Sequence, residues 1–357
     1  MRQHIARQGG WIGFDRFMQE ALYGPGWGYY VRGDGQLGQR PSGAPGGGGG
    51  DFVTAPEMSR FFGRALAVQV AQALQQTGTR DIWEFGAGSG ALAAQLLGAL
   101  APQIGHYTIV DISGSLRQRQ QQTLQAYAGK VRWVDQLPER LQAVVVGNEL
   151  LDAMPVQLLA RIADIWHERG VAFDAASGRL AWADRPTALR PPLEVAGDQD
   201  YLTEIHLQAE GFVRMLGDRL ERGAAFLIDY GFPEREYYHP QRSMGTVMCH
   251  RGHRMDTDPL SDVGEKDITA HVNFTGLALA AQELPGFGVL GYTSQARFLL
   301  NCGLLSLLEG ATLAERTMAQ KLLMEHEMGE LFKVIGFCRG EPWEAIGFAQ
   351  GDRTHTL

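Results

Sequence analysis

The sequence predicts an α/β fold in which a largely parallel sheet is covered by helices. From residue 81 onward, short and nearly continuous apolar strands alternate with helical segments, a pattern typical of parallel sheets with covered faces. A glycine-rich turn at residues 86–90 joins the first of these strands to a helix. The 357 residues are 45% hydrophobic and 20% charged, which favours a folded chain over a disordered one.

Residues 1–80 are predicted to form an extension that precedes the sheet. Residues 41–50 are rich in glycine and predict a flexible insertion. Thr54 followed by Glu57 predicts a capping box, with Pro56 in the first helical turn. Apolar residues then recur at helical spacing, which predicts one helix over 55–75.

Residues 81–357 are predicted to form the core. The expected strands are 81–86, 106–112, 131–134, 143–148, 224–231, 288–293 and 331–339, and the expected helices are 90–100, 115–127, 200–221 and 294–328. Two less regular stretches, about 156–220 and 232–273, are interpreted as substrate-binding insertions. The first is expected to contain hairpin strands at 161–167 and 179–183, and the second is polar and rich in arginine and histidine.

Composition excludes several classes of protein. The net charge of −8 argues against a nucleic-acid partner. No uninterrupted apolar run approaches the roughly 18–20 residues that span a bilayer. The N-terminus has no apolar segment of the secretory type and does not resemble a long transit peptide, so a cytoplasmic location is expected. Cys249 and His250 with His253 lack a second matching cluster, so no metal site is expected.

The most specific local pattern is the turn that runs from Glu84 to Gly90. Its glycines allow a tight bend close to a ligand, and the N-terminus of the following helix attracts an anion. Asp111 closes the next strand, where a carboxylate can accept both hydroxyls of a ribose. These features predict a nucleoside-containing cofactor. The turn fits the dinucleotide form G-x-G-x-x-A, but the acidic residue two before the first glycine resembles the first motif of S-adenosylmethionine-dependent methyltransferases.

Polar side chains follow the fourth strand directly. In a doubly wound sheet this strand end lies next to the cofactor, and Asn148, Glu149 and Asp152 can all accept hydrogen bonds there. This arrangement would align an N–H nucleophile with a methyl donor. A helix start, with Asn148 as its N-cap, is the alternative. Asp229 and Tyr230, at the end of a later strand, are an alternative catalytic pair.

A series of stretches in fixed order carries a family resemblance over about residues 17–303: FMQEALYGPGWGYY, DFVTAPEMSRFFGRALA, EFGAGSGALA, VDISGSLRQRQ, GNELLDAMPV, LIDYGFPEREYY, GTVMCHRGHRMDTDPLSDVGEKDITAHVNFTGLA and GYTSQARFLLNCG. This series resembles the MidA family of protein arginine methyltransferases, which includes the mitochondrial complex I assembly methyltransferase.

The resemblance implies a class I methyltransferase fold, which is Rossmann-like. Its seven-stranded sheet has helices on both faces, and the N-terminal extension and inserted helical or irregular elements are added to it. It also implies that S-adenosylmethionine is the cofactor and that the substrate is a protein. By family resemblance, this protein substrate is expected to be a respiratory-complex subunit. The expected cofactor residues are Glu84, Gly86, Ala87, Gly88, Gly90, Asp111, Ile112, Ser113, Asn148, Thr54 and Pro56.

The expected catalytic residues are Glu149, Asp152 and Asn148. The guanidinium of arginine stays protonated at neutral pH, and paired carboxylates can bind its fork and orient one nitrogen. Three other functions stay open on the sequence. One is an NAD(P)-dependent oxidoreductase that uses the same glycine turn. The second is an assembly factor that holds S-adenosylmethionine with little turnover, and the third is a small-molecule methyltransferase.

Overall fold

The computed structural model describes residues 1–32, 53–111, 113–251 and 254–357. The insertion predicted at 41–50 and the predicted site residue Ile112 lie outside these ranges. The largest sheet has the strand order β15-β16-β10-β5-β2-β3-β4, and the short β14 pairs with β10. The bounds of these strands are Ile82–Phe85 (β2), Tyr107–Val110 (β3), Val131–Val134 (β4), Leu141–Asn148 (β5), Leu220–Phe232 (β10), Val272–Asn273 (β14), Phe287–Ser294 (β15) and Phe332–Arg339 (β16).

The strand order has a reversal at β2. Strands β4, β3, β2, β5 and β10 are parallel neighbours, whereas β16 is antiparallel to both β10 and β15. The chain moves outward from β2 to β3 and β4 and then returns to β5 on the other side of β2. In such sheets ligands bind outside the carboxyl ends of the strands at the reversal. The predicted α/β fold is confirmed, and seven strands of this sheet follow one another in the order given above.

Two apolar clusters pack against this sheet. Side chains alternate between the two faces of a sheet along each strand, so alternate residues of β5 belong to different clusters. Val144 and Val146 of β5 belong to a cluster with α4 and α5. Ala143 and Val145 belong to a cluster with α7 and α9. The helices concerned are Arg60–Thr77 (α4), Ala91–Leu100 (α5), Leu207–Arg219 (α7) and Phe274–Gln282 (α9).

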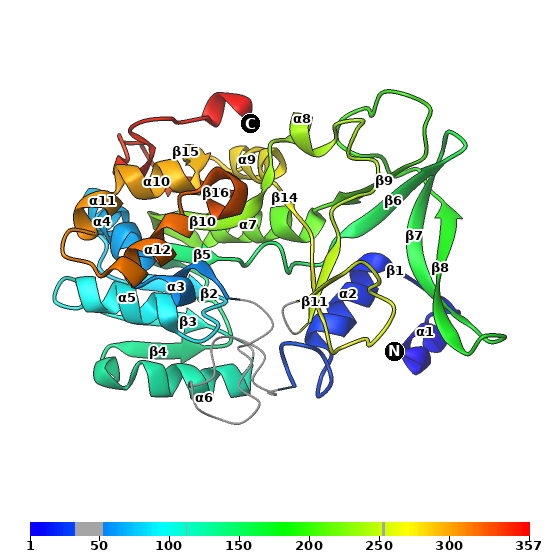
Figure 1. Ribbon diagram of the computed structural model, residues 1–357, viewed down its shortest axis with the longest axis horizontal. Helices are drawn as coiled ribbons and strands as arrows, with labels where there is room; N and C mark the ends of the chain where they lie inside the picture. The colour runs from blue at the N-terminus through cyan, green and yellow to red at the C-terminus, as the bar shows by residue number, and fades with distance from the viewer. Residues whose placement is uncertain (33–52, 112, 252–253) are drawn as a thin grey trace.

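A second lobe, to the right of the main sheet in Figure 1, contains the N-terminal residues. Its antiparallel sheet has the order β1-β7-β6-β9, with β8 paired to β7. Phe17 and Met18 of α2 pack in one cluster with Val171 of β7 and with Ala153. Since Ala153 follows β5, the lobe packs against the segment that leaves β5. The elements are Arg2–Arg7 (α1), Trp11–Gly13 (β1), Phe14–Tyr23 (α2), Gln157–Ile162 (β6), Ile165–Asp174 (β7), Arg179–Pro186 (β8) and Tyr201–Ile205 (β9).

The stretch 232–273 contains a small sheet of order β12-β11-β13. The sequence showed little periodicity there because each of these strands has only three or four residues. Its strands and the remaining helices are Met248–Arg251 (β11), Arg254–Asp256 (β12), Asp267–Thr269 (β13), Ala55–Met58 (α3), Gly114–Thr123 (α6), Gln125–Tyr127 (η1), Glu234–Tyr237 (α8), Gln295–Asn301 (α10), Leu304–Leu307 (α11), Leu313–Lys321 (α12), Glu325–Gly329 (η2), Ile346–Phe348 (η3) and Thr354–Thr356 (η4).

The helix predicted over 55–75 is two helices. Ser59 between α3 and α4 is extended, with φ −146° and ψ 123°, and its hydroxyl accepts a hydrogen bond from the backbone N–H of Phe61. Serine is a strong N-cap and interrupts the helical pattern. The capping box predicted at Thr54 is wrong, because the Thr54 side chain makes no cap hydrogen bond.

Further elements differ from the sequence prediction. The helical stretch expected over 294–328 is divided into α10, α11, α12 and η2. The helix expected over 200–221 begins only after β9, since Tyr201–Ile205 pairs with β6. The strand predicted at 161–167 is interrupted by the turn between β6 and β7, where Ala163 and Asp164 have φ of 46° and 64°. Positive φ at both central residues is typical of tight hairpin turns. Within the described ranges, no helix combines the length and apolarity needed to cross a membrane.

Candidate functional site

A cavity of about 290 Å³ lies where β2 and β5 end. Most of the predicted site residues line it: Thr54, Pro56, Glu84, Gly86, Ala87, Gly88, Asp111, Ser113, Asn148 and Glu149. Gly90 and Asp152 are not among the residues that line it. The fold therefore brings together side chains from the extension, the glycine turn and the segment after β5, as expected for a site at the reversal of a doubly wound sheet.

The glycine turn lines the cavity with its backbone. Gly86, Gly88 and Gly90 have φ of 66°, 52° and 82°, in the left-handed region that favours glycine. A Cβ added at Gly88 would meet no heavy atom within 4 Å, so this backbone faces open space. Gly90 is the N-cap of α5, and the first N–H groups of that helix have no partners within the helix. The turn can thus hold a ligand close to the backbone.

Asp111 is held in place from two sides. Its Oδ1 accepts from the backbone N–H of Ser113 at 2.9 Å, and its Oδ2 accepts from Gln120 Nε2 at 2.7 Å. The same amide nitrogen of Gln120 donates to the carbonyl oxygen of Gly88 at 3.0 Å. Burial raises the pKa of Asp111, and the hydrogen bonds from Ser113 and Gln120 oppose this shift. Gln120, which the sequence prediction missed, therefore ties the carboxylate to the glycine turn.

We expect Gln120→Leu to weaken about tenfold the binding of the cofactor that the family resemblance implies. The variant loses a hydrogen bond to a charged group, which contributes about 1.5–3 kcal/mol in proteins. Titration calorimetry measures the effect, with Gln122→Leu as the matched control, since Gln122 is exposed on the same helix. Equal affinities for the two variants would contradict the role given to Gln120.

Glu84 is buried below the turn. Its Oε2 accepts from the Tyr107 hydroxyl at 2.7 Å. Burial raises the pKa of Glu84 to about 8, against the lowering effect of this hydrogen bond. The carboxyl lines the cavity and is set in a fixed orientation by Tyr107.

Asn148 and Glu149 form the wall where β5 ends. Asn148 Nδ2 donates to Glu149 Oε1 at 3.0 Å, while the buried Asn148 Oδ1 has no hydrogen-bond partner among the described residues. Burial raises the pKa of Glu149 to about 8, and the nearby Asp152 adds to this effect. Glu149 has φ of 50°, and a turn follows it, so the interpretation of Asn148 as a helix N-cap is wrong.

Asp152 does not line the cavity, but it is close enough for its charge to act on Glu149. Its Oδ2 accepts from the Tyr230 hydroxyl at 2.5 Å, and its buried Oδ1 has no partner among the described residues. Burial raises the pKa of Asp152 to about 6, and the hydrogen bond from Tyr230 opposes this shift. Asp152 can thus act on the cavity through its charge and through its neighbour Glu149.

Asp229 has a structural role, which corrects the alternative prediction of a catalytic group. It is fully buried. Its Oδ2 accepts from three successive backbone N–H groups, those of Leu150, Leu151 and Asp152, at 3.0, 2.8 and 3.2 Å. Burial and the charge of Asp152 raise the pKa of Asp229. Because the oxygen is fully engaged by the backbone, Asp229 fixes the turn that positions Glu149.

His271 packs against aromatic rings. Its ring stacks on Phe232 at 5.3 Å between centroids and meets the edge of Tyr230 at 5.1 Å. Burial lowers the pKa of His271 to about 4, so the ring is neutral at pH 7. This geometry indicates a packed histidine rather than a general base.

The cavity also contains residues that sequence reasoning missed. Tyr23 and Tyr30 line it from the N-terminal lobe, and Glu57 lines it from α3. No spacing rule links residues 23 and 30 to a strand end more than 100 residues later. The only sequence signal was that both tyrosines lie in the first of the stretches that carry the family resemblance.

The chain is similar to several known proteins. A family model described as "Putative S-adenosyl-L-methionine-dependent methyltransferase" matches residues 65–293. Protein arginine methyltransferase NDUFAF7 of Danio rerio is 28% identical over 82% of this chain and 73% of its own length. The Homo sapiens protein of the same name is 27% identical over 87% and 75%.

A solved structure covers the whole chain. It is a Burkholderia thailandensis protein bound to S-adenosyl-homocysteine, 50% identical to this chain, and the alignment covers 100% of this chain and 95% of that one with a TM-score of 0.93. The two NDUFAF7 proteins are named as mitochondrial. That finding contradicts the expectation of a cytoplasmic location.

Proposed function

This chain belongs to the family of S-adenosylmethionine-dependent methyltransferases, and we propose that it transfers the methyl group to an arginine side chain of a protein. S-adenosylmethionine is its cofactor. The pattern of the glycine turn alone had also fitted a dinucleotide. The curated relatives named as protein arginine methyltransferases support the choice of acceptor.

The residues of the cavity fit this cofactor. The glycine turn offers an open backbone surface at Gly88, and Asp111 lies at the end of β3, where a ribose is bound in folds of this kind. Glu84, Ala87, Ser113, Thr54 and Pro56 complete our proposed cofactor set, together with Gly86 and Gly90. When bound, the cofactor supplies an electrophilic methyl group.

The observation that carries the choice of arginine is a group of buried carboxyls beside the cofactor residues. Glu149 lines the cavity, and the charge of the nearby Asp152 acts on it. The main causes of the pKa shifts of the two carboxyls are burial, neighbouring carboxyls and hydrogen bonds, and none of these main causes is a basic side chain. A buried carboxyl is neutralised either by a proton or by a paired cation, so Glu149, which is mostly protonated at pH 7 in the free protein, suits a cationic ligand that displaces this proton.

The side chains then act on the acceptor as follows. The Glu149 carboxylate binds two N–H groups of the guanidinium fork and turns one nitrogen toward the methyl group. Asn148 Oδ1, which has no partner among the described residues, accepts a further N–H. As the N–C bond to the methyl carbon forms, the carbon–sulfur bond would break and leave the thioether S-adenosylhomocysteine, while the nitrogen gives up a proton that Glu149 accepts.

We also propose a division of the chain. Residues 1–80 form an N-terminal extension, and residues 81–357 form the methyltransferase core with helices on both faces of its sheet. The segments 156–220 and 232–273 bind the protein acceptor. A subunit of a respiratory complex is the acceptor class to test first.

We expect kcat/KM to rise about tenfold per pH unit from pH 6 towards pH 8 and to level off above it. The pKa of Glu149 is raised to about 8, so in the free enzyme most of this carboxyl is protonated at pH 7, and only the ionised form pairs with a guanidinium. The measurement is a pH profile of initial rates. A flat profile between pH 6 and 8 would argue against Glu149 as the acceptor ligand.

Labelling tests the proposed function. A protein extract from cells that lack this protein is incubated with radiolabelled S-adenosylmethionine and the purified enzyme. We expect labelled protein bands that are absent without the enzyme. Tight S-adenosylhomocysteine binding without any labelled protein would instead favour the assembly factor, and label in small molecules only would favour the small-molecule methyltransferase.

A further inference from the structure

Two tyrosines from the N-terminal lobe line the same cavity as the glycine turn and Glu149. Tyr23 is the last residue of α2, and Tyr30 follows a short glycine-rich turn. Their rings are stacked, with centroids 5.5 Å apart and planes 23° apart. We call these two residues the tyrosine pair. It adds two aromatic side chains from the N-terminal lobe to a cavity that Phe85 of β2 also lines.

The hydroxyl groups of the pair are both engaged. Tyr23 donates to the carbonyl oxygen of Ala153 at 3.0 Å, and Tyr30 donates to Asp267 Oδ1 at 2.9 Å. Ala153 directly follows Asp152, so Tyr23 is bonded to the segment that carries the carboxyl group of Glu149. This bond places Tyr23 next to the segment to which the proposed function assigns the acceptor.

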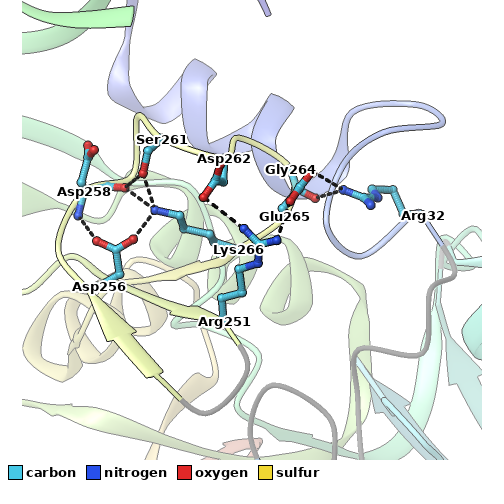
Figure 2. Close-up of polar contacts among 9 residues, drawn as sticks. All are labelled: Arg32, Arg251, Asp256, Asp258, Ser261, Asp262, Gly264, Glu265 and Lys266. Carbon is cyan, nitrogen blue, oxygen red and sulfur yellow. Dashed lines mark hydrogen bonds and ion pairs between the residues drawn. The ribbon is translucent and has the colours of Figure 1, made fainter. Parts of the chain in front are cut away.

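Figure 2 shows polar contacts that join Arg32, which follows Tyr30 by two residues, and Lys266, which precedes Asp267, to the loop between them and Asp256. The buried Lys266 ammonium pairs with Asp256 and donates to the Asp258 carbonyl at 2.8 Å and the Ser261 hydroxyl at 2.6 Å. These bonds close the loop 256–266 on itself. Asp267 comes directly after Lys266, so its position is set by this loop.

The same network reaches the tyrosine side. Arg251 pairs with Asp262 at 3.0 Å and with Glu265 at 2.8 Å. Arg32, two residues after Tyr30, donates to the carbonyl oxygen of Gly264 at 3.2 Å. The loop 256–266 is thus bonded to Arg32, close to Tyr30, and to Lys266, next to Asp267. This arrangement holds the ring of Tyr30 in one position.

We propose that the tyrosine pair determines acceptor specificity by stacking on a planar cation, the guanidinium of arginine, opposite Glu149. This inference rests on the proposed function. A guanidinium is flat and weakly hydrated and stacks on aromatic rings, whereas the ammonium of lysine has no flat face. Asp267 is a positioning residue that acts through Tyr30.

Substitution separates this role from cofactor binding. We expect Tyr30→Leu and Tyr23→Leu to raise the apparent KM for protein acceptors about tenfold, measured with dilutions of the same cell extract, while the affinity for S-adenosylhomocysteine stays unchanged. Tyr127→Leu, which removes a half-buried tyrosine outside the cavity, is the matched control. Unchanged KM, or an equal loss of S-adenosylhomocysteine affinity, would overturn the proposal.

A double-mutant cycle tests the positioning role. We expect Asp267→Ala to raise KM and Asp267→Asn, which keeps an acceptor oxygen, to restore most of the loss. In a Tyr30→Phe background, where the hydroxyl is absent, Asp267→Ala should add nothing. Full additivity of the two substitutions would mean that Asp267 acts elsewhere, and this part of the proposal would fall.

A binding experiment makes the inference independent of turnover. The protein loaded with S-adenosylhomocysteine is titrated with the amides of acetyl-arginine, acetyl-lysine and acetyl-citrulline. We expect binding of the arginine compound only, and weaker binding to Tyr30→Leu. If extracts show no arginine methylation but this binding pattern holds, the proposed function fails, and the role of the tyrosine pair in specificity is retained. If the wild type does not prefer the arginine compound, the role of the tyrosine pair is refuted.

Discussion

Glu149→Gln is expected to lower kcat by about 10²–10⁴-fold and to leave the affinity for S-adenosylhomocysteine within about twofold of the wild type. The amide can neither pair with a guanidinium cation nor accept its proton, and general base catalysis contributes about this factor. Initial rates with labelled S-adenosylmethionine and calorimetry measure the two quantities. Glu341→Gln, an exposed carboxyl in the C-terminal segment, is the control.

The stability of Glu149→Gln separates loss of chemistry from loss of fold. The pKa of Glu149 is about 8 in the folded protein, above its ordinary value of 4.5. The native state therefore binds a proton more tightly than the unfolded state, and stability contributed by this group falls as the pH rises from about 4.5 through 8. We expect the variant to melt at a higher temperature than the wild type at pH 9. A lower melting temperature together with lost cofactor binding would contradict this account of Glu149.

Asp229→Ala is expected to destabilise the protein by more than about 3 kcal/mol and to abolish transfer. The substitution leaves three buried N–H groups without an acceptor, and each unsatisfied buried group costs about 1–3 kcal/mol. Urea denaturation measures the free energy of unfolding. The turn that positions Glu149 loses its only side-chain acceptor among the described residues.

Asp229→Asn is the matched variant for this prediction. Its carbonyl oxygen can accept from the same three N–H groups, but its amide then faces the N–H of Tyr230, which donates to Asp229 Oδ1 in the wild type. One donor is left unpaired, so we expect an intermediate loss of stability, about 1–2 kcal/mol. A free energy of unfolding for Asp229→Ala within 1 kcal/mol of the wild type would show that the turn does not depend on this carboxyl.

The parts of the site that the sequence predicted are encoded locally. Gly86, Gly88 and Asp111 each lie at the carboxyl end of a short apolar strand, and parallel pairing brings such ends to one edge. Asn148 and Glu149 were predicted for the same reason. Their presence in one cavity follows from the order of β2, β3 and β5 in the sheet.

The parts that the sequence did not predict depend on contacts distant along the chain. Asp229 accepts from backbone groups that lie 77 to 79 residues earlier, and Tyr30 bonds to a carboxyl 237 residues later. No local pattern encodes such pairs. The break at Ser59 was missed for a different reason, since the apolar spacing continues on both sides of a single capping residue.

The central claim is that Glu149 supports methyl transfer to arginine. The most direct test is acid hydrolysis of extract proteins labelled by the wild type and by Glu149→Gln, followed by chromatography of the labelled amino acids. The account predicts methylarginine with the wild type and a loss of about 10²–10⁴-fold in that product with the variant. Label on an amino acid other than arginine, or equal methylarginine with both enzymes, would contradict it.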